Sequence, residues 1–348
     1  MQTAPVSGPA SARREFELND LTTDQLERQL DESVETLARV RSEIGKVIFG
    51  QEDVIEECLV TLLCGGHALL VGVPGLAKTR LAATLGTVLG LGEKRIQFTP
   101  DLMPFDILGS EVVDELPSGE RSFRFIRGPV FSQLLMADEI NRASPRTQAA
   151  LLQAMQEGKV TVAGTDHALP EPFHVLATQN PIEQEGTYPL PEAQLDRFLL
   201  QINVGYPSEE AERRMMIATT TGEESMAQKV MDGPQLMALQ ALVRRLPIGE
   251  QLVQDILDLV RSARPEGGAD DEIAQRISWG PGPRASQALM LAVRVRAMLD
   301  RRLAPSREDL RMMAPPVLRH RMAVTFAARA EGTGVDDVIE RLVARVPG

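Results

Sequence analysis

The residues with the clearest chemical potential form one short segment, Gly72-Val73-Pro74-Gly75-Leu76-Ala77-Lys78-Thr79. It follows an apolar run at 67–71 that predicts a buried strand, and it precedes a segment at 80–85 that predicts a helix. A loop between a strand and a helix N-terminus directs backbone N–H groups at a bound anion. Lys78 could contact the β- and γ-phosphates of a nucleotide, and the Thr79 hydroxyl could bind Mg²⁺. All residues from Gly72 to Arg80 are therefore candidate nucleotide contacts.

Ala77 departs from the G-x-x-x-x-G-K-[ST] pattern, which has glycine at its sixth position. Alanine is small and can adopt the right-handed backbone of a helix start, so we expect the loop to keep its shape. The alternative is an ordinary Gly/Pro turn before a helix. The flanking strand and helix favour the phosphate-binding loop.

A second candidate is the acidic pair Asp138-Glu139, which ends an apolar run at 131–137 about 60 residues after the loop. A carboxylate at the carboxyl end of a strand beside such a loop can hold Mg²⁺ through water. Glu139 would then be placed to polarise an attacking water. A solvated pair in a surface turn is the alternative, and the four apolar residues before the pair count against it.

Composition narrows the class of protein. The chain has 348 residues, is 43% hydrophobic and carries a net charge of −12, which disfavours a general nucleic-acid binder. No apolar run is long enough to span a membrane, and the first residues show no signal-peptide pattern. Cys58 and Cys64 are predicted to be free buried thiols, which favours a reducing, cytoplasmic compartment. The four histidines form no metal-ligand spacing with them.

The order of predicted elements indicates an α/β fold. Residues 1–18 predict a disordered tail, and an amphipathic helical stretch between 26 and 47 either packs on the core or meets a neighbouring subunit. Strands and helices alternate over 19–204, with inserted hairpins at 110–125 and after 159. Residues 205–348 are predicted to form an all-α lid without strands. Its helices are expected at Ala211–Thr219, Pro234–Arg245, Glu250–Arg261, Ala285–Asp300 and Arg307–Val317.

Four segments together resemble the MoxR family of AAA+ ATPases, over roughly residues 40–348 and in the right order. They are the loop above, Ala137-Asp138-Glu139-Ile140-Asn141-Arg142-Ala143, Ala177-Thr178-Gln179-Asn180-Pro181, and Leu190-Pro191-Glu192-Ala193-Gln194-Leu195-Asp196-Arg197-Phe198. The family shows the same alanine in its loop. The resemblance implies an AAA+ P-loop parallel sheet flanked by helices and followed by a helical lid domain.

The resemblance also implies roles for two further polar residues. Asn180 would sense the γ-phosphate, although an asparagine before Pro181 could simply form a turn. Arg197 would enter the site of a neighbouring subunit and neutralise charge in the transition state. Its alternative is an ion pair within its own chain, for example with Asp196.

Other implied contacts lie nearer the ends of the chain. Arg284, which opens a predicted lid helix, would report the nucleotide state to the lid, whereas a bare surface cation would be unfavourable at a helix N-terminus. Ile48, Phe49 and Gly50 match the segment that meets adenine, and core packing explains them equally well. The two hairpins would line a central pore or face a client.

These observations predict a ring-forming homo-oligomer, expected to be hexameric, that binds ATP and Mg²⁺ and hydrolyses ATP. Lys78, Thr79 and Asp138 would hold the nucleotide and metal, Glu139 would activate water, and Arg197 would complete the next subunit's site. The resemblance implies a chaperone that remodels protein clients, often beside a partner with a von Willebrand factor A domain. The rival hypotheses are a DNA motor of the same superfamily and a nucleotide-gated scaffold with little hydrolysis.

Overall fold

A parallel sheet forms the centre of the molecule. The computed structural model describes residues 23–115, 121–182, 186–220, 226–265 and 271–347, so the tail predicted at 1–18 lies outside the described residues. Five strands of the described chain pair in the order β2-β5-β8-β1-β9, and every neighbouring pair is parallel. Their bounds are β1 (Ala68–Val71), β2 (Glu93–Gln97), β5 (Leu134–Asp138), β8 (His174–Gln179) and β9 (Leu200–Asn203).

Each face of the sheet carries its own hydrophobic core. Along β5, Leu134 and Met136 belong to one cluster of buried residues, whereas Leu135 and Ala137 belong to the other. This division follows the two-residue period of a strand, which sends successive side chains to opposite faces. Both faces are covered by helices, as a parallel sheet requires. One core includes α1 (Thr23–Gly45), α2 (Glu52–Leu63) and α3 (Lys78–Val88), and the other includes α4 (Pro104–Leu108) and α5 (Pro145–Glu157).

Helix α1 buries its apolar stripe within its own chain. Leu30, Val34, Leu37, Val40 and Ile44 recur at helical spacing and are all buried in the larger core. Of the two alternatives for this stretch, packing on the core therefore accounts for its apolar face.

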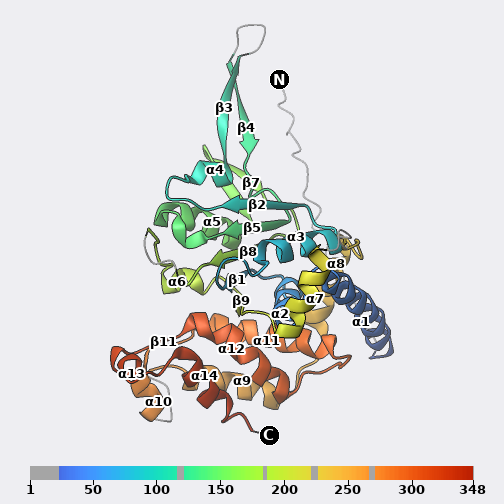
Figure 1. Cartoon of the computed structure of the whole chain (residues 1–348), viewed down its shortest axis with the longest axis vertical. Helices are drawn as coiled ribbons and strands as arrows, with labels where there is room; N and C mark the ends of the chain where they lie inside the picture. The colour runs from blue at the N-terminus through green and yellow to red at the C-terminus, as the bar shows by residue number, and fades with distance from the viewer. Residues whose placement is uncertain (1–22, 116–120, 183–185, 221–225, 266–270, 348) are drawn as a thin grey trace, which may run out of the picture.

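Both predicted hairpins are confirmed. Strands β3 (Gly109–Glu115) and β4 (Arg121–Arg127) pair antiparallel and project from the body of the molecule (Figure 1). Strands β6 (Lys159–Val162) and β7 (Thr165–Ala168) form the shorter hairpin. Phe125 of the first stacks on His167 of the second, with ring centroids 4.0 Å apart. The two insertions therefore support one another at the base of the longer one.

The C-terminal part is mainly helical and packs against α1 and α2 within the larger core. The five helices predicted there are confirmed, each to within two residues at either end. The prediction of no strands was wrong, because β10 (Ile277–Trp279) pairs with β11 (Ala323–Val324). Strands this short show no two-residue period, and their partner is distant in sequence. The domain division at 204 stays a prediction. The helices are α7 (Glu209–Thr220), α8 (Gly233–Arg245), α9 (Glu250–Ser262), α10 (Asp271–Arg276), α11 (Pro283–Leu299), α12 (Arg307–Leu318), α13 (Phe326–Ala330) and α14 (Val335–Val343).

Candidate nucleotide-binding site

The loop between β1 and α3 has the backbone of an anion-binding loop, although Ala77 does not adopt the backbone conformation that we expected for it. Ala77 has φ 56° and ψ 18°, which is left-handed, so the expectation of a right-handed backbone was wrong. The pattern has glycine at this position because a positive φ is required there. Alanine carries the smallest side chain that can occupy it, at a cost of about 1 kcal/mol. Gly72 is constrained differently, because a Cβ there would lie 2.5 Å from the Val204 carbonyl oxygen.

A cavity of about 410 Å³ lies at the carboxyl ends of β1, β5 and β8. It collects six of the predicted polar residues in one place, as expected for the switch edge of a parallel sheet. They are Lys78, Thr79, Arg80, Asp138, Glu139 and Asn180. We refer to this space as the phosphate cavity.

Lys78 folds back onto its own loop. Its Nζ donates hydrogen bonds of 2.7 Å to the carbonyl oxygens of both Gly72 and Val73. Burial lowers the pKa of Lys78, while Asp138 and Glu139 act in the opposite direction. The ammonium is therefore tethered close to the cavity, where phosphate oxygens could take the place of the two carbonyls.

Asp138 is held from several sides. Thr79 Oγ1 donates to its Oδ2 over 3.0 Å, and Thr178 Oγ1 donates to its Oδ1 over 2.8 Å. Arg95 reaches the same Oδ2 through Nε at 2.9 Å and Nη2 at 2.8 Å. A carboxylate beside a hydroxyl matches the oxygen ligands that Mg²⁺ prefers. Among the described residues, no group of three or more His, Cys, Asp or Glu is placed to hold a metal ion.

Glu139 sits in a left-handed backbone conformation, with φ 55° and ψ 51°. Its amide N donates to Thr178 Oγ1 over 2.8 Å, and its Oε2 accepts from Gln97 Nε2 at 2.8 Å and Arg142 Nη1 at 3.2 Å. A strained residue whose side chain is tied by two neighbours is typical of a functional position.

Sequence reasoning missed Arg95 and Gln97. Both line the phosphate cavity, because β2 pairs with β5 in a register that sets Gln97 opposite Asp138. The exposed pair flanks the buried Ile96. This alternation is visible in the sequence, but the pairing of the strand with β5, which brings both side chains to the cavity, is not.

Asn180 lines the phosphate cavity and stabilises a turn, and its role toward the γ-phosphate stays a prediction. It is 6% exposed and lines the phosphate cavity. Its Oδ1 also accepts a hydrogen bond of 3.2 Å from the amide N of Ile182, which stabilises the turn after β8.

A second cavity, of about 270 Å³, adjoins the loop on its other side and shares residues 74–77 and Arg80 with the phosphate cavity. Ile48, Phe49, Tyr206 and Met215 help to line it, a set that suits a flat apolar ring such as a base. Ile48 is also 3% exposed and belongs to the larger core, so core packing accounts for it, and contact with adenine stays a prediction. Gly50 does not line this cavity, and a Cβ there would lie 2.1 Å from that of Ala211.

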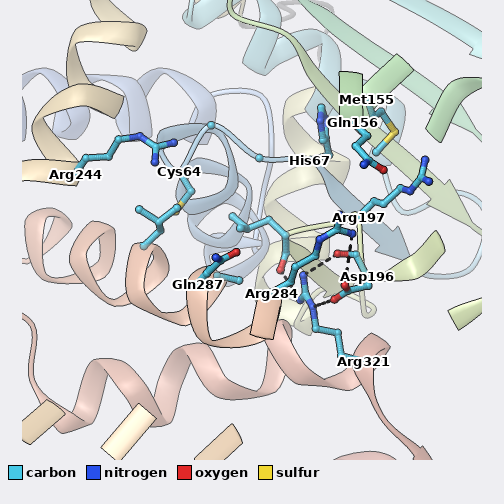
Figure 2. Close-up of a pocket in the computed structure, with 15 residues that line it drawn as sticks. Cys64, His67, Met155, Gln156, Asp196, Arg197, Arg244, Arg284, Gln287 and Arg321 are labelled. Atoms are coloured by element: carbon cyan, nitrogen blue, oxygen red, sulfur yellow. Dashed lines mark hydrogen bonds and ion pairs between the residues drawn. The ribbon is translucent and has the colours of Figure 1, made fainter. Parts of the chain in front are cut away.

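Arg197 and Arg284 lie at the opposite end of the sheet from the phosphate cavity. They line a third cavity, of about 320 Å³ (Figure 2), that shares no residue with the phosphate cavity. His67 and Leu199, which also line it, immediately precede β1 and β9. Since the four residues of β1 span roughly 13 Å, neither arginine reaches the phosphate cavity of its own protomer.

Asp196 is paired with two other arginines and not with Arg197. Arg284 Nη1 lies 3.6 Å from Asp196 Oδ2, and Arg321 Nε donates to Asp196 Oδ1 over 2.8 Å (Figure 2). Within the described parts of the chain, the side chain of Arg197 has neither a hydrogen bond nor an ion pair. The alternative of an ion pair between Arg197 and Asp196 therefore does not apply.

The two cysteines are free and buried, as predicted. Burial raises the pKa of both thiols. In the part of the chain that the structure describes, no helix is both long and apolar enough to cross a membrane.

Two family models match this chain. The model described as "ATPase family associated with various cellular activities (AAA)" matches residues 67–200, and the model described as "AAA lid domain" matches residues 270–342. The first range contains the loop and the acidic pair, and the second contains Arg284 and Arg321.

Relatives of known name or structure match most of the chain. Chaperone MoxR1 of Mycobacterium tuberculosis is 41% identical over 90% of this chain and 82% of its own. Protein MoxR of Paracoccus denitrificans is 31% identical over 87% of this chain and 94% of its own. The crystal structure of a protein from Cytophaga hutchinsonii, described as an ATPase candidate, superposes with a TM-score of 0.86 at 36% identity. That superposition covers 93% of this chain and 98% of the other.

Proposed function

This chain belongs to the MoxR family of AAA+ ATPases, and we propose that it hydrolyses ATP at sites that two neighbouring protomers complete together. The proposal is carried by one observation. The phosphate cavity and Arg197 lie at opposite ends of the sheet, so one protomer cannot supply both to the same nucleotide.

Within one protomer, the loop amides and Lys78 would bind the phosphates, and the residues at 48, 49, 206 and 215 would enclose the base. Thr79 and Asp138 would hold Mg²⁺, which supplies positive charge against the β- and γ-phosphates. Glu139 would orient and deprotonate the attacking water. Asn180, which lines the same cavity, would contact the γ-phosphate.

Arg197 of one protomer would enter the phosphate cavity of the next and neutralise charge in the transition state. Arg284 lines the same cavity as Arg197, so we propose that it acts on the same neighbouring nucleotide. Repetition of this contact builds a closed ring, which we propose to be a hexamer. The region after residue 204 would serve as the lid domain whose position changes when the γ-phosphate leaves.

We further propose that this cycle remodels or matures protein complexes in the cytoplasm. The relative from Mycobacterium tuberculosis carries the name chaperone, which supports this role by similarity. A partner with a von Willebrand factor A domain and protein clients would be engaged outside the nucleotide site.

A mixing experiment tests the shared site. Arg197→Ala protein keeps its own nucleotide site but cannot donate, and Glu139→Gln protein can donate but cannot hydrolyse. Each variant alone should hydrolyse ATP at least about 100-fold more slowly, while each binds ATP with near-normal affinity. Assembled together from monomers, they should regain activity, because Glu139→Gln protomers supply Arg197 to intact Glu139 sites.

Three outcomes would contradict the proposal. No regained activity in a mixture shown by light scattering to be co-assembled would exclude a shared site. Wild-type phosphate release by the Glu139→Gln protein alone would exclude the assigned role of Glu139. Wild-type protein that assembles with ATP yet releases no phosphate would favour the scaffold hypothesis.

A further inference from the structure

A turn of the lid forms hydrogen bonds to the segment that carries Arg197. The turn is η2 (Arg319–Arg321), which connects α12 to β11. Arg319 Nη1 donates to the Gln201 carbonyl oxygen over 3.1 Å, and His320 Nε2 donates to that of Phe198 over 3.0 Å. Arg321 makes the remaining contacts. Two segments more than a hundred residues apart in sequence are thus joined along their backbones.

Arg321 is the centre of this junction. It is 2% exposed, and each of its five guanidinium N–H groups finds an acceptor. Nε donates to Asp196 Oδ1 at 2.8 Å, and four bonds run to carbonyl oxygens. These are Leu199 (3.0 Å) and Val317 (2.6 Å) from Nη1, and Asp196 (3.3 Å) and Phe198 (2.6 Å) from Nη2.

The charge of Arg321 is balanced locally. Burial lowers the pKa of its guanidinium, and the carboxylate of Asp196 opposes that shift. A buried cation with every donor satisfied has one preferred position, because moving it leaves several acceptors unpaired. The lysine side chain has one charged group with three donors and cannot reproduce this planar set of bonds.

Arg197 itself has no such anchor. Its side chain is unpartnered within the described residues, so its position depends on the backbone that carries it. That backbone is fixed immediately before and after it, through the carbonyl oxygens of Asp196 and Phe198, and both accept from Arg321 Nη2.

We propose that Arg321 is the positioning residue for Arg197, holding its backbone against the lid so that the lid and the donated arginine move as one unit. This inference rests on the proposed role of Arg197 in a neighbouring site. It adds that the lid of one protomer fixes the position of the arginine that neutralises transition-state charge in the next protomer's site.

The test uses Arg321→Lys in the full-length protein. We expect turnover to fall by about 10-fold to 100-fold, as for a catalytic group displaced by about 1 Å, with ATP affinity unchanged. The defect should lie in the supply of Arg197 to the neighbouring site and not in the variant's own nucleotide site. When the variant is co-assembled with Glu139→Gln protein, activity should return to about one quarter of wild type, because half of the sites keep Glu139 and half of those face an intact donor.

A matched control comes from the same lid. Arg302 makes a bidentate pair with Asp309, at 2.6 and 2.7 Å, and its hydrogen bonds run to Asp300, Ser306 and Asp309 within the lid. Arg302→Lys should lower thermal stability without a donation defect. If Arg321→Lys does not fold, Asp196→Asn provides a milder change that keeps an acceptor but removes the charge, and it should show the same rescue by Glu139→Gln protein.

The outcomes separate this inference from the proposed function. If Arg197→Ala is rescued by Glu139→Gln protein but co-assembled Arg321→Lys is not, the site is shared and Arg321 does not position Arg197. Normal turnover of Arg321→Lys alone would also overturn the inference. If Arg197→Ala is not rescued either, the shared site itself is wrong.

Discussion

Gln97 Nε2 donates a hydrogen bond of 2.8 Å to Oε2 of Glu139, which joins β2 to the residue that follows β5, and both side chains line the phosphate cavity. Glu139 is the residue proposed to deprotonate water. Its Oε2 already accepts two hydrogen bonds, from Gln97 and from Arg142, so one of them must loosen before that oxygen can accept a proton.

Removing the bond from Gln97 should raise the basal rate. We expect Gln97→Leu to increase steady-state phosphate release about threefold with unchanged ATP affinity, because the Glu139 carboxylate is then freer to face water. Gln201→Leu, on the strand at the opposite edge of the sheet, should leave the rate unchanged. A slower Gln97→Leu protein would mean that Gln97 holds Glu139 in its productive orientation.

Arg95 should compete with the metal. It contacts Asp138 Oδ2, the atom that also accepts from Thr79, so a divalent cation must displace or face a guanidinium. We expect Arg95→Gln to lower the Mg²⁺ concentration for half-maximal turnover about fivefold, which corresponds to roughly 1 kcal/mol for a partly exposed ion pair. Lys94→Gln removes the same charge from the same strand outside the cavity and should have no such effect. An increased Mg²⁺ requirement in Arg95→Gln would contradict this competition.

Replacing Ala77 by glycine should change the free energy of unfolding in the opposite direction to the same replacement inside a helix. Its positive φ disfavours a side chain, so Ala77→Gly should raise the free energy of unfolding by about 0.5 kcal/mol. Ala83→Gly, inside α3, should lower it by about 1 kcal/mol. Chemical denaturation of the two variants measures both signs, and a loss of stability in Ala77→Gly would show that the left-handed conformation is not costly.

Glu57 should make stability depend on pH. Burial raises its pKa from 4.5 to about 7, with Asp53 and Glu56 adding to the effect and Arg319 opposing it. The folded state therefore keeps the proton where the unfolded state loses it, so stability falls as pH rises from about 4.5 to 7. The loss is at most roughly 3 kcal/mol above pH 7.

Glu57→Gln tests this dependence by thermal denaturation at pH 5 and pH 8.5. The variant should gain stability relative to wild type at pH 8.5 and much less at pH 5. Glu52→Gln, an exposed change on the same helix, should shift stability similarly at both values. An equal gain for Glu57→Gln at both pH values would contradict the raised pKa.

Sequence patterns identified the site residues that directly follow a predicted strand. The loop and Asp138-Glu139 each follow an apolar strand, so a parallel sheet brings them to one edge without further information. The backbone of Ala77 was misjudged because residue size was considered and the required φ was not. The lid strands were missed because Ala323 and Val324 depend on pairing with residues 277–279.

Other residues were out of reach for a physical reason. Arg95 and Gln97 became site residues through register with a neighbouring strand, and Arg321 through contacts with a segment 125 residues away. Such long-range contacts leave no spacing signature in a single sequence. Arg197 was found only through family resemblance, because nothing around it in the chain points to a nucleotide bound elsewhere.

The location of the phosphate cavity and Arg197 at opposite ends of the sheet gives each protomer a direction. If protomers associate head to tail through these two ends, every open chain leaves one terminal cavity without an arginine and one terminal arginine without a cavity. A closed ring is the arrangement in which every cavity receives an arginine. An open chain lacks only one complete site, so activity per protomer would rise as the chain lengthens and reach its maximum at closure, and incomplete arcs would be recognised by their unequal turnover from one cavity to the next.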